Sequence, residues 1–244
     1  MGTKAALLLG MLLLAGCTAP NSRLTVAAAS NLAPAFDQVG AEFTQATGIP
    51  VAFSYAATTI LARQIAEAAP FDVFAAADTA HLDQLVAAGR IVPGSRAVYA
   101  RGQLALWAPG GAVRDLHDLA GPQVRFVAVA QPELAPYGAA AIEALKAAGL
   151  WEAVQPKLVY ANDIGQAKQF ASSGNADAAF TAYSLVMLES GTVVRLDQKL
   201  YPAIQQAIGT VAVSRRLADA KRFSEFVLSP RGQAILAAHG YLAP

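Results

Sequence analysis

The sequence is poor in cysteine and in charge. Its single cysteine, Cys17, excludes an intramolecular disulfide and any metal site built on paired cysteines. Only 14% of the residues are charged, and the net charge of +1 excludes the basic surface that nucleic-acid-binding proteins need. The chain has no internal repeat and no low-complexity tract. What remains is 244 residues, 55% of them hydrophobic, which suffices for one large domain or two lobes.

Familiar catalytic signatures are also missing. The sequence has no glycine-rich dinucleotide or phosphate loop, no nucleophile elbow and no HExxH motif. The three histidines, His81, His117 and His239, stand far apart, which favours surface or helix-end positions over catalysis or metal ligation. We therefore predict a protein that is not an enzyme, uses no cofactor and binds no metal cation directly.

The N-terminus reads as a targeting segment. Lys4 precedes an apolar run over residues 5–15, which is too short to span a membrane and is typical of a secretory signal. The run ends in Leu-Ala-Gly-Cys at residues 14–17, which resembles the bacterial lipobox and implies cleavage before Cys17 and acylation of that residue. We predict a signal peptide at 1–16, an acylated tether at 17–22 and an extracytoplasmic, lipid-anchored protein. The alternative is an ordinary secretory signal with an incidental cysteine.

The rest of the chain alternates apolar runs with segments of helical periodicity, which indicates an α/β fold with mostly parallel sheets. We expect strands at residues 24–29, 51–55, 72–76, 103–108, 124–130, 157–160, 178–182 and 208–213. No Gly/Ser-rich linker divides the chain, so we expect it to cross to a second lobe and return. The predicted lobe I comprises residues 23–103 and 209–244, and the predicted lobe II residues 104–208.

Small polar residues recur where predicted strands give way to helices. A helix start leaves about four backbone N–H groups without partners and carries roughly half a positive charge, so it can bind an anion. Any one of these junctions is explained as an ordinary helix cap. Two in each lobe, at the sheet edge where ligands bind, predict donors that converge on one anion between the lobes. The junctions are Ser30-Asn31, Thr58-Thr59, Pro136-Tyr137-Gly138 and Asn162-Asp163-Ile164.

The chemistry of these groups narrows the ligand. Hydroxyl, amide and backbone N–H groups all donate, and a fully deprotonated tetrahedral oxyanion only accepts. Hydrogenphosphate still carries a proton and would need an acceptor, whereas the only acid at the junctions, Asp163, is placed to cap a helix. This reasoning predicts a tetrahedral dianion and leaves molybdate, tungstate and sulfate open.

The ordered set of motifs resembles the molybdate-binding proteins of molybdate ABC transporters. The motifs are AAASNL at 27–32, LARQI at 61–65, PFDVFAAAD at 70–78, APYG at 135–138, NDIGQA at 162–167, LSPRGQA at 228–234 and HGY at 239–241. The resemblance implies a two-lobed periplasmic-binding-protein fold of type II that closes around molybdate or tungstate. It also implies a monomer that delivers the anion to a membrane permease driven by an ATPase.

The resemblance also implies the ligand-binding residues, which are Ser30, Asn31, Thr58, Tyr137 and Ile164, the last through its backbone N–H. Thr59 and Tyr183 are secondary candidates. Many members place a tyrosine donor after the strand that corresponds to residues 178–182, but here that position is Ala182, so we expect Tyr137 to supply the phenol.

Three other functions stay open from the sequence alone. One is a binding protein for sulfate or another small oxyanion. A second is a lipoprotein enzyme that uses Tyr137 or Asp163 as an acid or base in the cleft. The third is a sensor that binds the anion without delivering it to a transporter.

Overall fold

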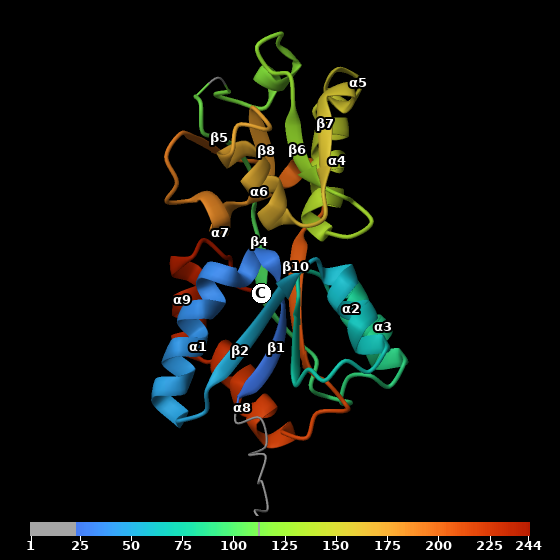
Figure 1. The fold of residues 1–244 in the computed structure, drawn as a ribbon, viewed down its shortest axis with the longest axis vertical. Coiled ribbons are helices and arrows are strands. Elements are labelled where there is room, and N and C mark those ends of the chain that lie inside the picture. Colours follow the sequence, from blue (N-terminus) through green and yellow to red (C-terminus); the bar gives the residue numbers. More distant parts are fainter. Residues whose placement is uncertain (1–22, 112) are drawn as a thin grey trace, which may run out of the picture.

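The computed structural model describes residues 23–111 and 113–244, which form two lobes stacked along the long axis of the molecule (Figure 1). Each lobe is built on a mixed sheet of five strands flanked by helices. The predicted signal peptide (1–16) and the tether with Cys17 (17–22) lie outside the described residues. Within the described residues, no helix has the length and apolar character needed to cross a membrane.

The sheet of lobe I has the strand order β2-β1-β3-β10-β4. β1 runs parallel to β2 and β3, whereas β10 runs antiparallel to β3 and β4. The parallel strands deliver their carboxyl ends to the edge that faces lobe II (Figure 1). The bounds are β1 (Leu24–Ala29), β2 (Val51–Ala56), β3 (Val73–Ala76), β4 (Ala97–Gly102) and β10 (Ile204–Thr210).

Helices cover both faces of this sheet. Side chains alternate along a strand, so Val26 and Ala28 of β1 point to one face and Ala27 to the other. The first face packs under α1, α8 and α9, and the second under α2 and α3 (Figure 1). The bounds are α1 (Ala33–Thr47), α2 (Thr58–Ala66), α3 (Ala80–Ala87), α8 (Leu217–Leu228) and α9 (Pro230–Ala238), with the 3-10 turn η1 (Ser30–Leu32) before α1.

Lobe II repeats this arrangement with the strand order β7-β6-β8-β5-β9. β6 is parallel to β7 and β8, and β5 is antiparallel to β8 and β9. The strands are β5 (Leu104–Ala108), β6 (Val127–Ala130), β7 (Leu158–Ala161), β8 (Ala178–Ala182) and β9 (Thr192–Arg195). The helices are α4 (Pro136–Ala147), α5 (Trp151–Val154), α6 (Ile164–Ser172) and α7 (Tyr183–Val186), with 3-10 turns η2 (His117–Ala120), η3 (Gln155–Lys157) and η4 (Gln198–Leu200).

The chain passes between the lobes at two neighbouring places. β4 ends at Gly102 and β5 begins at Leu104, and the chain returns after η4 into β10. β10 pairs with strands of lobe I from Ile204 onward, so the expected second boundary, between residues 208 and 209, falls inside this strand. We therefore propose that lobe I comprises residues 23–103 and 204–244, and lobe II residues 104–203.

The C-terminal segment lies beside these two passages (Figure 1). Arg101 and Leu242 exchange backbone hydrogen bonds of 2.9 Å, and the Gln103 side chain donates to the Gly240 carbonyl at 2.6 Å. One hydrophobic cluster runs from Leu24 in lobe I to Leu145 in lobe II. The two lobes thus share a continuous core in this conformation.

Candidate functional site

The four predicted junctions lie at the carboxyl ends of parallel strands that face each other across the lobes. β1 and β2 pair in register up to Ala29 and Ala56, so the residues that follow them start side by side. In lobe II, β6 and β7 pair in register up to Ala130 and Ala161. An ideal Cβ on Gly165 of α6 would lie 4.0 Å from the Ser30 Cβ, which places the first turn of α6 against η1 of the other lobe.

Lobe I offers two side-chain hydroxyls. Thr58, the first residue of α2, is 1% exposed, and its Oγ1 accepts a hydrogen bond of 3.1 Å from the Ala77 backbone N–H. A hydroxyl carries one proton, so an accepted bond leaves that proton for another partner. The Thr58 proton has no acceptor among the described residues, and the Ser30 hydroxyl has no partner of either kind there. Both groups can therefore donate to a bound anion.

Asn31 is buried in a different way. Its two Nδ2 hydrogens go to Gln206 Oε1 at 3.1 Å and to the Tyr241 hydroxyl at 3.0 Å. The backbone carbonyl oxygen of Asn31 accepts from the Tyr241 hydroxyl at 2.7 Å and from the Ser184 hydroxyl at 3.0 Å. The side chain therefore holds the architecture together, and the backbone N–H is the donor that Asn31 can offer to an anion.

Tyr137 lies in the first turn of α4 and is 2% exposed. Its hydroxyl accepts a hydrogen bond of 3.1 Å from Gln206 Nε2 and lies close to the backbone of Gly102, where an ideal Cβ would be 2.0 Å away. Burial raises the pKa of Tyr137 well above its ordinary value, so the phenol keeps its proton. Within the described residues that proton has no acceptor, as for Thr58.

Ile164 begins α6, and the side chain of Asp163 caps this helix. Asp163 Oδ1 accepts from the backbone N–H groups of Gly165 at 2.8 Å and Gln166 at 3.0 Å, which confirms its predicted role as a cap. The cap does not engage the Ile164 N–H. That group, next to the positive end of the helix dipole, can serve an anion.

The secondary candidates make other contacts. Thr59 joins the lobes at the edge of the cleft, because its N–H donates to the Leu134 carbonyl at 3.3 Å and its hydroxyl donates to the Glu133 carbonyl at 3.1 Å. The ring of Tyr183 lies under the Arg195 guanidinium, 5.2 Å from centroid to Cζ. The same ring packs against Gly240: an ideal Cβ on Gly240 would lie 2.6 Å from Cδ1 of Tyr183.

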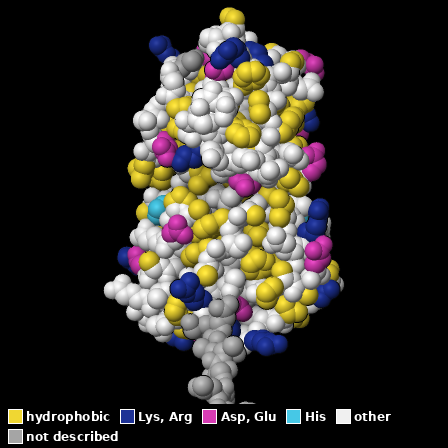
Figure 2. All heavy atoms as spheres, in the orientation of Figure 1, with side chains coloured by type: hydrophobic (Ala, Val, Ile, Leu, Met, Phe, Trp, Pro, Cys, Tyr) yellow, Lys and Arg dark blue, Asp and Glu magenta, His cyan; other side chains and the backbone are white. Residues whose placement is uncertain are grey.

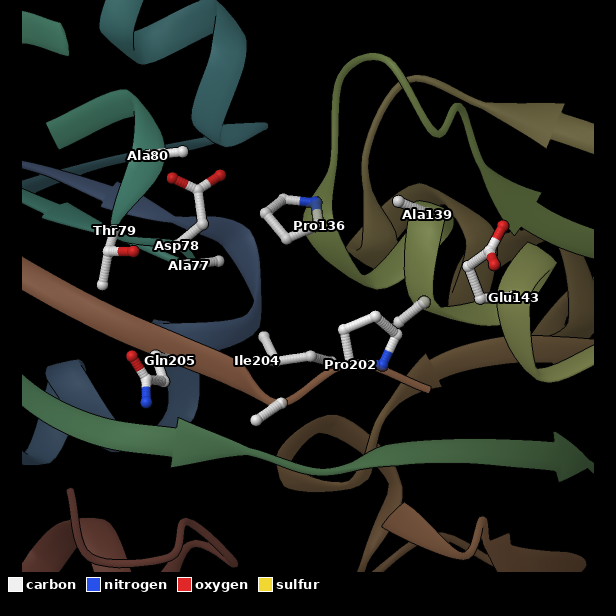
Figure 3. A pocket seen from close by; sticks show the side chains of 12 residues that line it. Ala77, Asp78, Thr79, Ala80, Pro136, Ala139, Glu143, Pro202, Ile204 and Gln205 are labelled. Atoms are coloured by element: carbon white, nitrogen blue, oxygen red, sulfur yellow. The ribbon is translucent and has the colours of Figure 1, made fainter. Parts of the chain in front are cut away.

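An open pocket of about 250 Å³ lies between the lobes next to these residues (Figure 3). Ala77–Ala80 line it from lobe I, α4 lines it from lobe II, and residues 202–205 lie below. Its titratable side chains are the carboxylates of Asp78 and Glu143, which would repel an anion. The predicted donor residues do not line this pocket, and Asn31, Thr58, Tyr137 and Ile164 are all buried.

Four polar residues of this region were not predicted from the sequence. Gln206, Tyr99, Tyr241 and Ser184 form a buried hydrogen-bond network with Asn31 and Tyr137. Gln206 is 0% exposed although Gln205 before it is exposed, and a β-bulge between Gln206 and Ala207 interrupts the register. A glutamine buried within a strand indicates a hydrogen-bond network around it, because a buried amide needs hydrogen-bond partners. Its partners, however, come from distant parts of the chain.

The described residues hold no group of three or more His, Cys, Asp or Glu side chains that could bind a metal ion. On the face shown in Figure 2, acidic and basic side chains are interspersed, without a patch of one sign.

Comparison with known proteins places this geometry in a family. Residues 24–242 match the family described as bacterial extracellular solute-binding protein. The chain belongs to this family. The solute-binding protein is 36% identical to the molybdate-binding protein ModA of Rhodobacter capsulatus, over 98% of this chain and 94% of that protein. It is 34% identical to the molybdate-binding protein ModA of Azotobacter vinelandii, over 98% and 97% of the two chains.

A solved structure agrees with these relatives. The periplasmic molybdate-binding protein of Azotobacter vinelandii superimposes with a TM-score of 0.87 at 32% identity, covering 91% of this solute-binding protein and all of that chain. The resemblance and the two-lobed α/β fold predicted from the sequence are thus confirmed. Both relatives are named as molybdate-binding proteins, and a further solved structure, with a TM-score of 0.69 at 26% identity over 91% of this chain and 99% of that chain, is the substrate-binding domain of a putative molybdenum ABC transporter from Clostridium difficile.

The contact at the cleft edge predicts a pH dependence of closure. Thr59 Oγ1 lies 2.9 Å from His81 Nε2, and His81 Nδ1 lies 2.7 Å from Asp78 Oδ2. The hydrogen bond that His81 Nδ1–H donates to the Asp78 carboxylate raises the pKa of His81. Neutral His81 presents Nε2 as an acceptor, so it competes with the Glu133 carbonyl for the single Thr59 proton. Protonated His81 donates through Nε2, which frees the Thr59 proton for the other lobe.

We expect this solute-binding protein to close more readily, and to hold its anion about threefold more tightly, near pH 6 than near pH 9. The sign follows from the raised pKa, since the stabilisation is present below it and is lost as the pH rises through it. Titration calorimetry at the two pH values measures the effect. In His81→Gln, whose amide donates without titrating, the difference should vanish; a difference of the same size there would contradict the assignment.

Proposed function

We propose that this protein captures molybdate or tungstate between its lobes by hydrogen-bond donation alone. The single observation that supports this most is the pair of buried hydroxyls on Thr58 and Tyr137. Each accepts a bond from a fixed N–H donor, so each turns its own proton outward. The Ser30 hydroxyl and the backbone N–H groups of Asn31 and Ile164 add three further donors. A fully deprotonated tetrahedral dianion is the ligand that suits such a set.

The proposed mechanism is closure of the cleft. The donors are divided between η1 and α2 of lobe I and α4 and α6 of lobe II, so they act together only when the lobes meet. An anion that binds the closed form better shifts the population toward it. In this proposal the charge of the anion is balanced by oriented dipoles and needs no cofactor and no covalent step.

We further propose that the protein works outside the cytoplasm as a monomer, held to a membrane by acylation of Cys17, which lies outside the described residues. The closed, loaded form would be recognised by an ABC permease, and its ATPase would drive release of the anion. Family membership supports the transport role in general terms.

Titration of the chain from Asn21 onward with molybdate tests the proposal. We expect one-to-one binding of molybdate that persists in an excess of sulfate. Sulfate is the smaller anion, so a site that closes around molybdate would make fewer contacts with sulfate. Binding abolished by sulfate would assign the protein to sulfate instead. No heat and no thermal stabilisation with either anion would overturn the oxyanion site, and the junctions would then be helix caps only.

A further inference from the structure

Gln206 stands at the centre of the buried network and contacts groups from both lobes. It is completely buried on β10, just after the chain returns from lobe II. Its Oε1 accepts from Asn31 Nδ2 at 3.1 Å and from the Tyr99 hydroxyl at 3.0 Å, both in lobe I. Its Nε2 donates to the Tyr137 hydroxyl of α4 at 3.1 Å.

These contacts fix the direction of the Gln206 amide. The Tyr241 hydroxyl donates its single proton to the backbone carbonyl of Asn31, so the side-chain atom of Asn31 that faces this hydroxyl must be the donor Nδ2. The same Nδ2 group faces Gln206, so the atom of Gln206 that it meets must be the oxygen. The nitrogen of Gln206 therefore faces Tyr137 and occupies a lone pair of the phenol. The Tyr137 proton must point away from Gln206, and burial keeps that proton in place by raising the pKa of the phenol.

We propose that Gln206 determines specificity for the protonation state of the oxyanion. By donating to Tyr137 it keeps the phenol a donor toward the cleft, so this position favours molybdate-like dianions over oxyanions that carry a proton, such as hydrogenphosphate. This inference rests on the proposed function, since it concerns the same site. Without Gln206, the phenol could rotate, present a lone pair to the cleft and accept the proton of hydrogenphosphate.

The backbone N–H of Ala77 donates to the Thr58 hydroxyl in the same way, but a substitution at position 77 does not remove a backbone N–H. Gln206 is therefore the position at which the idea can be tested. Gln206→Glu keeps the shape of the side chain and replaces the donor with a carboxyl oxygen, to which Tyr137 would donate its own proton. Gln206→Met keeps a similar length and removes both polar groups.

The experiment measures the affinities for molybdate and for hydrogenphosphate by titration calorimetry in the wild type, Gln206→Glu, Gln206→Met and Tyr137→Phe. It adds the two double variants that combine a change at Gln206 with Tyr137→Phe. The readout is the ratio of the two affinities, because an added negative charge affects both dianions alike and cancels. Thermal unfolding of each variant shows that it is folded before the ratio is compared.

We expect each change at Gln206 to lower the molybdate-to-hydrogenphosphate ratio about tenfold to a hundredfold, the larger effect belonging to Gln206→Glu. In the Tyr137→Phe background the same changes should alter the ratio less than about twofold, because Gln206 acts through the phenol. An unchanged ratio in either single variant, or an equal drop in both backgrounds, would overturn the inference. Failure of the wild type to bind molybdate would instead refute the proposed function.

Discussion

Removal of the two lobe I hydroxyls, in the double variant Ser30→Ala and Thr58→Val, is expected to weaken molybdate binding by roughly 100- to 10,000-fold. Each hydroxyl has a proton that no described residue accepts, and each would give a hydrogen bond to a dianion inside a closed cleft. Bonds to charged groups contribute about 1.5–3 kcal/mol each. Titration calorimetry on the folded variant measures the loss.

The two single variants separate the contributions. Ser30→Ala removes a hydroxyl that has no other partner, so its effect should appear in binding and leave the free energy of unfolding unchanged. Thr58→Val also leaves the Ala77 N–H without an acceptor and should lower stability as well. The matched control is Ser173→Ala with Thr192→Val, which lie in lobe II away from the junctions. An affinity equal to that of the control would remove Ser30 and Thr58 from the site.

Gly138→Ala is expected to destabilise the protein by about 2 kcal/mol or more and to abolish anion binding. Gly138 follows Tyr137 in the first turn of α4, where this turn packs on the end of β6. An ideal Cβ at this position would lie 2.2 Å from the Ala130 carbonyl oxygen and 2.9 Å from its carbon. Both are backbone atoms, so α4 itself must shift and carry Tyr137 out of line with Gln206.

Gly110→Ala is the matched control for this prediction. An ideal Cβ on Gly110 meets nothing within 4 Å, so the change should leave stability and binding at wild-type values. Urea denaturation measures the free energy of unfolding, and molybdate titration measures the site. A Gly138→Ala protein with wild-type affinity would show that the position of α4 does not matter for the ligand.

The bounds of strands and helices were predicted correctly from the sequence where the hydrophobic pattern and the capping or turn residues indicated the same element. The strands at residues 24–29 and 178–182 have the expected bounds. The junction Pro136-Tyr137-Gly138 lies in the first turn of α4, which begins at Pro136, in the position that proline favours. β10 was displaced by four residues, because the apolar run from Ile208 suggested a start that pairing with β4 places at Ile204. β4 and β9 were missed, since each mixes polar and apolar residues and contains an arginine.

The same distinction holds for the candidate site: local sequence signals predicted the junctions but not the hydrogen-bond partners of their side chains. Its junctions were visible because small polar residues directly follow apolar strands, and the structure brings those strand ends together. What Asn31 does with its side chain was not predictable, because its partners Gln206 and Tyr241 lie 175 and 210 residues away. Pairings of that kind arise from the folded topology and leave no local pattern in the sequence.

The crowding at Gly102 bears on how this protein family can vary. An ideal Cβ there would lie 2.0 Å from the Tyr137 hydroxyl and 2.7 Å from Gln206 Nε2, so any larger residue collides with the phenol and its amide partner together. Tyrosine at position 137 and glutamine at position 206 each require glycine at position 102, and alanine at 137 would relieve only the first of the two clashes. The three positions should change as a linked set during evolution, with the glycine arriving first.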